Sequence, residues 1–286
     1  MQMRTGRFLP FILVLPSIAF LAVLILVPVV QVLLFSVVAE SGGYTLENFR
    51  RLLADVTFSE AGRNTLLLLL VIVPLQVALA LAMALLIHSR FRGHRWFSYI
   101  YAVPLAVSDL AAGILWLAVF TERGYLNSAL QNVGMIDRPV LWLSFDNFAG
   151  MLTAVVIAET WRTTAIALVI LLAGLQLIPR DLFDAADLFG ASRLRRTVDV
   201  VLPLLRPSLQ KALIVRTVLG LPIFAVVFAL AGRNMPVLAG EAYTWFATNQ
   251  DEHIAAAYAV VILGLTFIGI LVYLRVFGLR EAEVQR

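Results

Sequence analysis

The sequence predicts an all-α, polytopic membrane protein with six transmembrane helices. Of its 286 residues, 61% are hydrophobic and 14% are charged, and the mean hydropathy of +0.92 exceeds that of soluble domains. Apolar stretches of about 20 residues or more recur along the chain, and a helix of that length crosses the hydrocarbon core of a bilayer. These stretches are too continuously apolar for barrel strands, in which inward and outward residues alternate.

The six apolar stretches form one predicted domain over residues 1–286. In chain order, the expected spans are about 8–38, 65–86, 96–120, 148–177, 207–231 and 254–276. Each must be helical, because a backbone amide in hydrocarbon has to bond within its own segment. The first stretch is too long for a secretory signal and ends in no small-x-small cleavage site, so we expect it to stay uncleaved. Pro222 is expected to bend the fifth span.

The distribution of basic residues predicts that both termini lie in the cytoplasm. With an inside N-terminus, the basic residues of the inside loops are Arg4, Arg7, Arg90, Arg92, Arg95, Arg180, Arg193, Arg195, Arg196, Arg206, Lys211, Arg275, Arg280 and Arg286. The smaller outside set is Arg50, Arg51, Arg63, Arg123, Arg138 and Arg233. This bias follows the positive-inside rule. Scattered among loops, these residues form no nucleic-acid-binding patch.

The chain lacks the residues that several classes of catalytic site require. The chain has no cysteine, and its three histidines are too dispersed for a metal centre or a catalytic triad. Its only lysine, Lys211, follows no glycine loop of the kind that holds ATP phosphates. We therefore expect no metal, no cofactor and no ATPase site in this chain.

The stretch 181–203, DLFDAADLFGASRLRRTVDVVLP, is a charged interruption between the fourth and fifth spans. Asp181 is expected to cap a short helix whose apolar face carries Leu182, Phe183, Ala186 and Phe189. Gly190 suits a turn with positive φ, and a second helical piece carrying arginines then runs to Leu202-Pro203, which is expected to close it. From composition alone, an ordinary charged loop with an interfacial helix is the favoured interpretation of this segment.

A spacing pattern in this stretch resembles the signature of ATP-binding-cassette importer permeases. The residues are Asp184-Ala185-Ala186, three residues, Gly190, nine residues, Val200, one residue and Leu202-Pro203. The family pattern has glutamate where this chain has Asp184 and isoleucine where it has Val200. The resemblance implies that Asp184, Ala185, Ala186, Gly190, Leu202 and Pro203 form a cytoplasmic coupling segment that docks on an ATPase.

Other stretches resemble the carbohydrate-uptake branch of that family, and specifically the first of its two permeases, of the maltose, trehalose or glycerol-phosphate type. They are LPFILVLPSIAFLAVLILVPVVQVLLFS, YTLENFRRLL and AETWRTTAIALVILLAGLQLIPRDLFDAADLFGAS. The resemblance implies a second permease subunit, two copies of a cytoplasmic subunit that uses ATP and Mg, and an extracytoplasmic solute-binding protein. It also implies a bacterial or archaeal inner membrane, with lipid as a partner and no nucleic acid. In the fifth span, LGLPIFAVVFALAGRNMPV departs from the family, where Trp-Asn precedes a run to Gly-Gly-Pro.

Four ionisable residues in the predicted spans are candidates for the substrate pathway: Asp109, Glu159, Arg162 and Arg216. A charge in hydrocarbon is costly, so partners or water are expected. Glu159 and Arg162 can pair along one helix and are interpreted as a structural or gating pair. Asp109 and Arg216 could face the pathway or pair with the second permease.

Three aromatic residues, Trp161, Phe224 and Tyr243, could stack on a sugar ring, and Trp161 and Phe224 are taken as candidates for the pathway. The alternative for each is packing or an interfacial belt. The sequence leaves three functions open: a permease for a sugar, such as a disaccharide or oligosaccharide; a permease for glycerol phosphate or another solute; and a self-sufficient secondary transporter or intramembrane enzyme. The third should show internal repeats or paired catalytic groups, and neither is visible.

Overall fold

The computed structural model describes residues 9–39, 42–89 and 91–276. In those ranges every regular element is helical, and one isolated antiparallel bridge pairs Val38 with Tyr44. The start of the first predicted span, at residue 8, lies outside the described residues, as do Arg4, Arg7, Arg90, Arg280 and Arg286.

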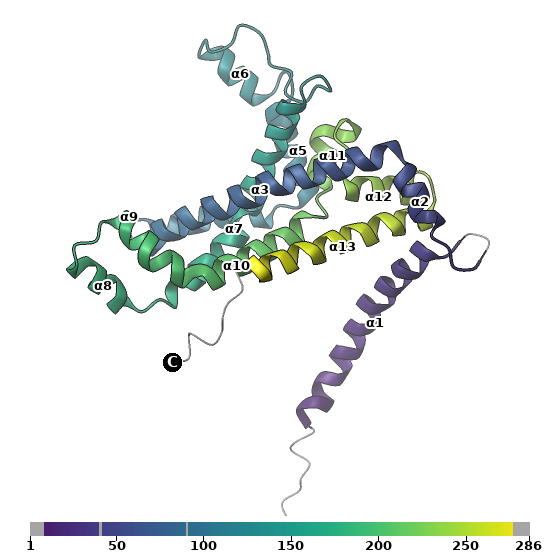
Figure 1. Cartoon of the computed structure of the whole chain (residues 1–286). Helices are drawn as coiled ribbons and strands as arrows, with labels where there is room; N and C mark the ends of the chain where they lie inside the picture. Colours follow the sequence, from purple (N-terminus) through teal and green to yellow (C-terminus); the bar gives the residue numbers. More distant parts are fainter. Residues whose placement is uncertain (1–8, 40–41, 90, 277–286) are drawn as a thin grey trace, which may run out of the picture. The chain divides into compact units, whose positions relative to one another are not determined.

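The helices follow one another in a single chain of elements (Figure 1). They are α1 (Leu9–Val37), α2 (Glu47–Ala54), α3 (Val56–His88), α4 (His94–Ala102), η2 (Val103–Ala106), α5 (Asp109–Phe120), α6 (Tyr125–Asn132), α7 (Phe148–Gln176), α8 (Arg180–Leu188), α9 (Arg193–Arg196), η3 (Thr197–Val201), α10 (Leu202–Gly220), α11 (Ala225–Ala231), η4 (Gly232–Asn234), α12 (Leu238–Ala247) and α13 (Glu252–Val276). The all-α prediction is confirmed.

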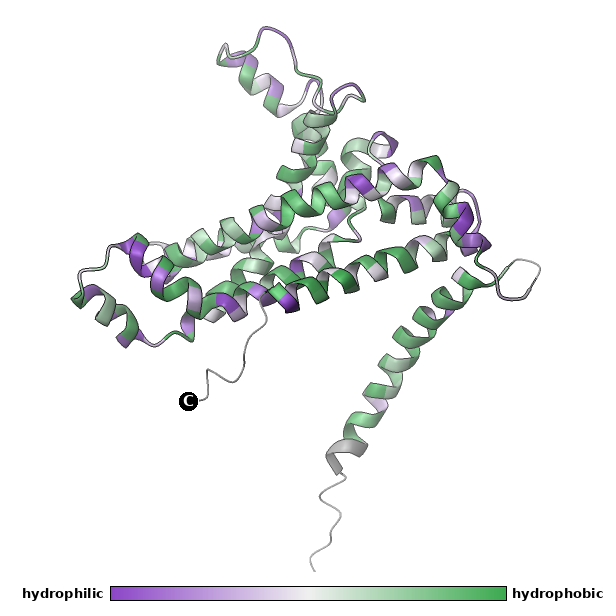
Figure 2. Cartoon of the chain, viewed as in Figure 1, coloured by the Kyte–Doolittle hydropathy of each residue, from purple (hydrophilic) through white to green (hydrophobic). Residues whose placement is uncertain are grey.

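Four helices of the described chain are long and apolar enough to cross a membrane: Leu13–Val37 of α1, and α3, α7 and α13. Two bent pairs bring this number to six if each pair is one span. Figure 2 shows the apolar colour continuing along α3 and α13, with polar colour strong on α9 and mixed with apolar colour on α8.

The range 96–120, predicted as one span, is not one helix. The pair His94–Ala106 and Asp109–Asn132 is bent by 104°. Pro104 lies in the 3-10 turn η2, Val107 is extended, and the hydroxyl of Ser108 accepts a hydrogen bond from the Ala111 N–H at 3.3 Å to start α5. A proline and a new N-cap within five residues therefore outweigh the continuous apolar pattern.

The range 207–231 is also divided. Helix α10 begins upstream at Leu202, passes through Pro207 and ends at Gly220; α11 begins at Ala225. The two parts meet at 56°, and Pro222 lies in the break, where the bend was expected. The bend separates α10 from the short helix α11, which packs on α5.

The described chain forms two compact units. One comprises Met1–Phe58 with Glu241–Val261, and the other comprises Ser59–Gly240 with Ile262–Arg286. In the first unit, Asn48 of α2 donates hydrogen bonds to the carbonyls of Phe35, Ser36 and Val38 at 3.2, 3.2 and 2.9 Å. These carbonyls lie at the end of α1, where no intrahelical donor remains, so one buried amide caps the helix.

Asp55, between α2 and α3, is the polar centre of the first unit. Its Oδ2 accepts hydrogen bonds from Tyr258 Oη at 2.9 Å and Trp245 Nε1 at 3.2 Å, and its Oδ1 accepts from the Thr57 N–H at 2.9 Å. Burial raises the pKa of this carboxyl, but the donors of Thr57, Tyr258 and Trp245 together hold the pKa below its ordinary 3.8. The carboxylate form therefore joins α12 and α13 to the start of α3.

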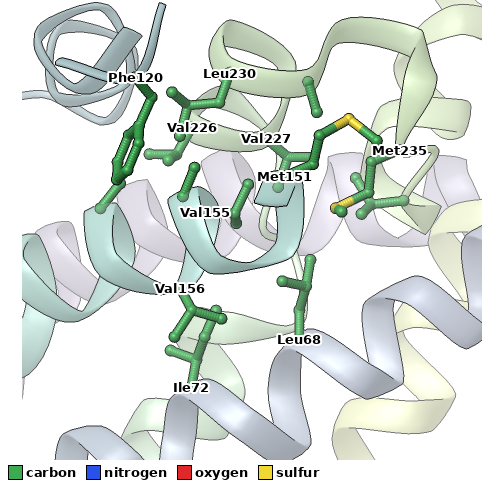
Figure 3. Close-up of a cluster of buried hydrophobic side chains, with 14 residues drawn as sticks. Leu68, Ile72, Phe120, Met151, Val155, Val156, Val226, Val227, Leu230 and Met235 are labelled. Atoms are coloured by element: carbon green, nitrogen blue, oxygen red, sulfur yellow. The ribbon is translucent and has the colours of Figure 1, made fainter. Parts of the chain in front are cut away.

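The second unit has two apolar cores. Figure 3 shows the first, where Val155 of α7 lies beside Val226 of α11 and Val156 of α7 lies beside Ile72 of α3. The second lies toward the α8 end and joins α3, α7 and α10 through Ala80, Leu171 and Leu205. Small residues at the contacts let these helices approach closely, as is typical of membrane bundles.

Candidate functional site

Residues 181–203, here called the signature segment, lie at one end of the second unit (Figure 1). Helix α8 begins at Arg180, one residue earlier than expected, and its N-cap position is Pro179. Asp181 is therefore in the first turn and is not the cap, which corrects the sequence-based expectation. A carboxylate in the first turn still stabilises the helix, because it faces the positive end of the helix dipole.

Gly190 ends α8 in a Schellman motif. Its φ is +73°, as the sequence predicted. The Gly190 N–H donates to the Asp187 carbonyl and the Ala191 N–H donates to the Ala186 carbonyl, both at 3.0 Å. This is the bond pair by which a left-handed residue terminates a helix and redirects the chain.

The second half of the segment contains no closing break. Ser192 caps α9 by accepting a hydrogen bond from the Arg195 N–H at 3.3 Å, and the chain then passes through the π-helix η3 into α10. Leu202 and Pro203 start α10 and do not close the segment, contrary to expectation. Pro203 lies directly after the π-turn, and because proline has no N–H, the backbone hydrogen bond of that position is absent there. The helical run is thus continuous from α9 into α10.

The residues of the signature pattern do not share one face. Asp184 is exposed, Ala185 is half-buried, and Ala186 is buried at 9% exposure against the rest of the chain. Two larger side chains are strongly exposed: Leu188 at 89% and Phe189 at 91%. Phe189 was expected on the apolar face of the helix with Leu182, Phe183 and Ala186, but it occupies the C-cap of α8, where the helical spacing no longer holds.

Charge and ring contacts hold α8 in place. Arg196 Nη1 lies 2.7 and 2.8 Å from the two carboxylate oxygens of Asp187, and the guanidinium lies 5.7 Å from the ring centre of Phe183. The ring of His88, at the end of α3, lies 5.3 Å from the same phenyl ring. The fold-back at Gly190 is therefore pinned by α9 on one side and α3 on the other.

A second group of functional candidates, here called the charge cluster, comprises Asp109, Glu159, Arg162 and Arg216, joined by Gln76. Arg216 Nε on α10 donates to Gln76 Oε1 on α3 at 2.7 Å. Gln76 Nε2 donates in turn to the Glu159 carbonyl at 2.9 Å and to Thr163 Oγ1 at 2.7 Å, both on α7. One glutamine thus connects three helices, and its side chain is fully buried.

The other end of the charge cluster is more open. Arg162 Nη1 lies 2.7 Å from Asp109 Oδ1, and Arg162 Nη2 lies 3.4 Å from both Glu159 carboxylate oxygens. The Asp109 side chain is 58% exposed, whereas those of Arg162 and Glu159 are 17% and 6% exposed. The predicted Glu159–Arg162 pair is present, and α5 is joined to it through Asp109. With two cationic and two anionic groups, the charge cluster has no formal net charge.

Sequence reasoning missed Gln76 and Thr163. Only charged and aromatic residues were selected within the spans, but a neutral amide in VIVPLQVALA also needs partners in hydrocarbon. The signal was present, because Gln76 is the one amide between Thr65 and Leu86.

The two aromatic candidates are packed against other side chains. The ring of Trp161 lies 5.9 Å from Trp116 in an edge-on contact, and Trp116 stacks on Phe120 at 5.6 Å. Phe224 lies at the bend before α11, 5.4 Å from Phe228. Both are half-buried, so packing accounts for much of their surface.

The chain is similar to known transport proteins. The model of the family described as "Binding-protein-dependent transport system inner membrane component" matches residues 76–278. The sulfoquinovosyl glycerol transport system permease protein SmoG of Agrobacterium fabrum is 30% identical over 96% of this chain and 92% of its own. The trehalose/maltose transport system permease protein MalF of Thermococcus litoralis is 32% identical over 96% and 95%. The sn-glycerol-3-phosphate transport system permease protein UgpA of Yersinia pestis is 28% identical over 91% and 92%.

A solved structure has the same fold. It is a chain of a bacterial ABC transporter involved in the import of the acidic polysaccharide alginate, with a TM-score of 0.83 at 18% identity. The match covers 94% of this chain and 95% of the other. At that identity the likeness concerns the fold alone, and it extends over both compact units.

Proposed function

Because the chain belongs to the binding-protein-dependent transport system inner membrane components, we propose that it forms one half of the pore of an ATP-driven sugar importer. It is a multi-pass protein of the inner membrane. Its relatives over nearly the full length include permeases named for trehalose, maltose and sulfoquinovosyl glycerol. The other half of the pore is a second permease subunit, and an extracytoplasmic protein delivers the sugar.

The observation that carries the proposal is the form of the signature segment. Asp184, Leu188 and Phe189 are exposed on α8, and the Schellman turn at Gly190 folds the chain back into α9 and then α10. Such a protruding helix offers a binding surface to a separate ATPase subunit. Ala185 adds contact at its edge, and Ala186 supports the helix from behind.

ATP binding and hydrolysis belong to two copies of a partner subunit, with Mg as their cofactor. When the ATPase pair closes, α8 moves with it, and the unbroken path through Leu202 and Pro203 carries the motion into α10. The ATPase can drive this change only if it binds the inward-open and outward-open states with different free energies. Because α8 binds a cytoplasmic ATPase, both termini and α8 lie on the cytoplasmic side of the membrane.

The charge cluster supports a neutral solute over a phosphorylated one. An anionic solute would require cations free to meet it, and the two candidates are Arg162 and Arg216. Arg216 is 2% exposed and bonded to Gln76, while Arg162 contacts both Asp109 and Glu159. The name of the Yersinia pestis relative contains glycerol phosphate, which is therefore the second candidate for the transported solute.

Asp109 and Arg162 are proposed to reach the solute pathway. An exposed carboxylate within a bent span pair faces water or protein, since lipid would exclude its charge. Glu159 and Arg216 hold this pair in position. Trp161 and Phe224 border the pathway and can present a ring edge to a sugar.

The deciding experiment is reconstitution. The chain, its partner permease and the ATPase are co-purified, placed in liposomes with the binding protein, and assayed for hydrolysis with a panel of sugars and with glycerol phosphate. Stimulation of hydrolysis and of uptake by a neutral sugar is expected. Failure to retain any ATPase would overturn the permease assignment, and stimulation by glycerol phosphate alone would replace the sugar with the second candidate.

A further inference from the structure

Helix α5 joins the charge cluster at one end to a structured loop at the other, and leads from the bundle of the second unit to α6 (Figure 1). Asp109 begins α5 and lies 2.7 Å from Arg162 on α7, and Phe120 ends α5. Its 12 residues form one unbroken helix, about 18 Å long. Displacement of one end of such a helix moves the other end.

Residues 121–147, here called the α6 loop, are joined closely to the end of α5. The Thr121 N–H donates to the Leu117 carbonyl at 2.9 Å, and the Gly124 N–H donates to the Thr121 carbonyl at 2.8 Å. A methyl group added at Gly124 would lie 2.6 Å from the Val119 carbonyl oxygen, so the turn admits no side chain there. Movement of the α6 loop is therefore passed to the end of α5.

Asn127 of α6 holds the α6 loop together, and it is 1% exposed. Its Nδ2 donates to the carbonyls of Glu122 and Val140 at 3.1 and 2.9 Å. Its Oδ1 accepts from the Val140 N–H at 3.1 Å and from Trp142 Nε1 at 3.2 Å. One amide therefore connects the two sides of the α6 loop and fixes the indole of Trp142.

A row of aromatic rings continues from Trp142 into the second unit. Trp142 meets Phe120 edge-on with ring centres 6.0 Å apart, and Phe120 stacks on Trp116 at 5.6 Å. Trp116 in turn meets Trp161 of α7 edge-on at 5.9 Å, and Trp161 directly precedes Arg162. Because Trp116 and Phe120 are four residues apart, they lie on one face of α5. The row therefore follows α5 from the α6 loop to the helix that carries Arg162.

The middle of α5 is held against α11 at Gly113. A methyl group added there would lie 2.5 Å from Ala229 Cβ, so the two helices approach closely. Gly113 is one helical turn from Asp109 and about two turns from Phe120, which gives α5 a short arm of about 6 Å and a longer arm of about 10 Å. Displacement of the Phe120 end therefore tilts α5 and moves Asp109 in the opposite direction by roughly half as much.

We propose that α5 is a lever by which an extracytoplasmic protein that contacts the α6 loop opens the ion pair between Asp109 and Arg162. Trp142 passes the displacement to Phe120, and tilting about Gly113 draws Asp109 away from Arg162. Helix shifts of about 1–2 Å are typical of switching transitions. Such a shift brings the 2.7 Å pair to the limit of an ion pair, about 4 Å. The lever rests on the proposed function, which supplies the solute-binding protein and places the α6 loop outside.

The Asp109–Arg162 contact is suited to opening. The Asp109 side chain is 58% exposed, so water can replace Arg162 as its partner. Arg162 keeps the carboxylate of Glu159 within 3.4 Å. The pair can therefore separate without leaving a buried charge uncompensated.

Distances between spin labels test the lever in the assembled transporter. The chain contains no cysteine, so labels are introduced at three exposed positions with Ala111→Cys on α5, Ser128→Cys on α6 and Val169→Cys on α7. Addition of the sugar-loaded binding protein should change the mean distance between the labels on α5 and α7 by about 1–2 Å. The distance between the labels on α5 and α6, which move together, should stay constant.

Trp142→Leu should abolish this change, because it removes both the bond to Asn127 and the ring contact with Phe120. Trp142→Phe keeps a ring beside Phe120 and should retain part of the change. In Trp142→Leu the stimulation of ATP hydrolysis by the loaded binding protein should fall about fivefold or more, the lower end of common allosteric couplings. Basal hydrolysis and the affinity for the binding protein should stay unchanged. Trp96→Leu, which removes a 75% exposed tryptophan of α4, is the matched control.

Four results would overturn the lever. The first is a distance between α5 and α7 that does not respond although the binding protein stimulates hydrolysis, in which case the transport proposal stands alone. The second is a full response in Trp142→Leu. The third is joint loss of affinity and stimulation in Trp142→Leu, which would make the α6 loop a docking surface only. The fourth is an equal loss of stimulation in Trp96→Leu.

Two further outcomes are also decisive. Should Trp142→Leu not assemble, as judged by size-exclusion chromatography, Trp142→Phe takes its place, and an unchanged response in that variant would overturn the lever. Absence of any stimulation in the wild type would refute the proposed function, and the lever with it.

Discussion

Arg216 Nε donates a hydrogen bond to Gln76 Oε1 at 2.7 Å, and both side chains are buried. The bond links α10 to α3 inside the second unit. Because Gln76 also donates to α7, the amide gives the guanidinium an acceptor without adding a third negative charge. Loss of either partner would leave an unsatisfied polar group where water is scarce.

Gln76→Leu should therefore lower stability by about 2–4 kcal/mol, since it leaves a buried charge without its acceptor. The measurement is the midpoint of thermal unfolding of the purified protein in detergent. Gln210→Leu is the matched control: that amide makes a single 3.3 Å bond to the Tyr273 carbonyl, and its loss should cost less.

A double variant tests the cause of the destabilisation expected in Gln76→Leu. If the cost comes from the stranded guanidinium, Gln76→Leu/Arg216→Met should be less destabilised than the sum of the two single changes, because the double change removes both partners. Strict additivity would contradict the coupling between these two residues.

Asp109→Asn is expected to impair sugar uptake while leaving stability nearly unchanged. The carboxylate is 58% exposed, so its 2.7 Å pair with Arg162 is screened and is worth about 1 kcal/mol or less. Its loss frees Arg162 to bind Glu159 alone and removes one polar link between α5 and α7. Uptake and unfolding should be measured on the same reconstituted preparation, with Asp146→Asn, an exposed loop carboxylate, as control. Equal uptake by wild type and Asp109→Asn would remove this pair from the pathway.

Gly190→Val should uncouple ATP hydrolysis from uptake. At φ +73° a β-branched residue is strained by about 1–2 kcal/mol, although no atom lies within 4 Å of the added Cβ. The Schellman turn would open and change the angle between α8 and α9. The measurement is sugar transported per ATP hydrolysed, which should fall severalfold.

Two further variants isolate the turn at Gly190. Gly190→Asn should retain most coupling, since asparagine tolerates this conformation better than other residues. Gly134→Val meets similar strain, at φ +71° with open surroundings, but lies far along the chain from the signature segment. If Gly134→Val uncoupled transport equally, strain alone would explain the effect.

Close packing between α5 and α11 leads to a further prediction. A methyl group added at Gly113 would lie 2.5 Å from Ala229 Cβ and 3.3 Å from Val226 Cα. Gly113→Ala should therefore cost about 1–3 kcal/mol through overpacking. Thermal unfolding should show partial recovery in Gly113→Ala/Ala229→Gly, which removes the opposing methyl. Gly264→Ala, with no atom within 4 Å, should be neutral, and no recovery in the double variant would refute this contact.

The sequence predicted the features that depend on local pattern. The positive φ at Gly190 and the Glu159–Arg162 pair follow from residue type and helical spacing, and both are present. The features it missed depend on tertiary neighbours. Nothing local shows that Gln76 meets Arg216, which is 140 residues away. The continuous apolar pattern of 96–120 also concealed the break that Pro104 and Ser108 produce.

Acid should remove the contribution of Asp55 to stability. Its folded pKa is lowered below 3.8, so the ionised form stabilises the fold at higher pH, and that stabilisation is lost as pH falls through the folded pKa. Asp55→Asn should therefore unfold at a lower temperature than wild type near neutral pH, where Tyr258 and Trp245 donate to a full carboxylate in the wild type. The difference between the two proteins should shrink from about pH 5 toward pH 3.

Calorimetry of both proteins across this range provides the measurement. Asp137→Asn, an exposed carboxylate with no ion pair among the described residues, should differ little from wild type at any pH. A gap between Asp55→Asn and wild type that stayed constant down to pH 3 would show that the geometry of the three donors, rather than the charge they stabilise, joins α12 and α13 to the start of α3.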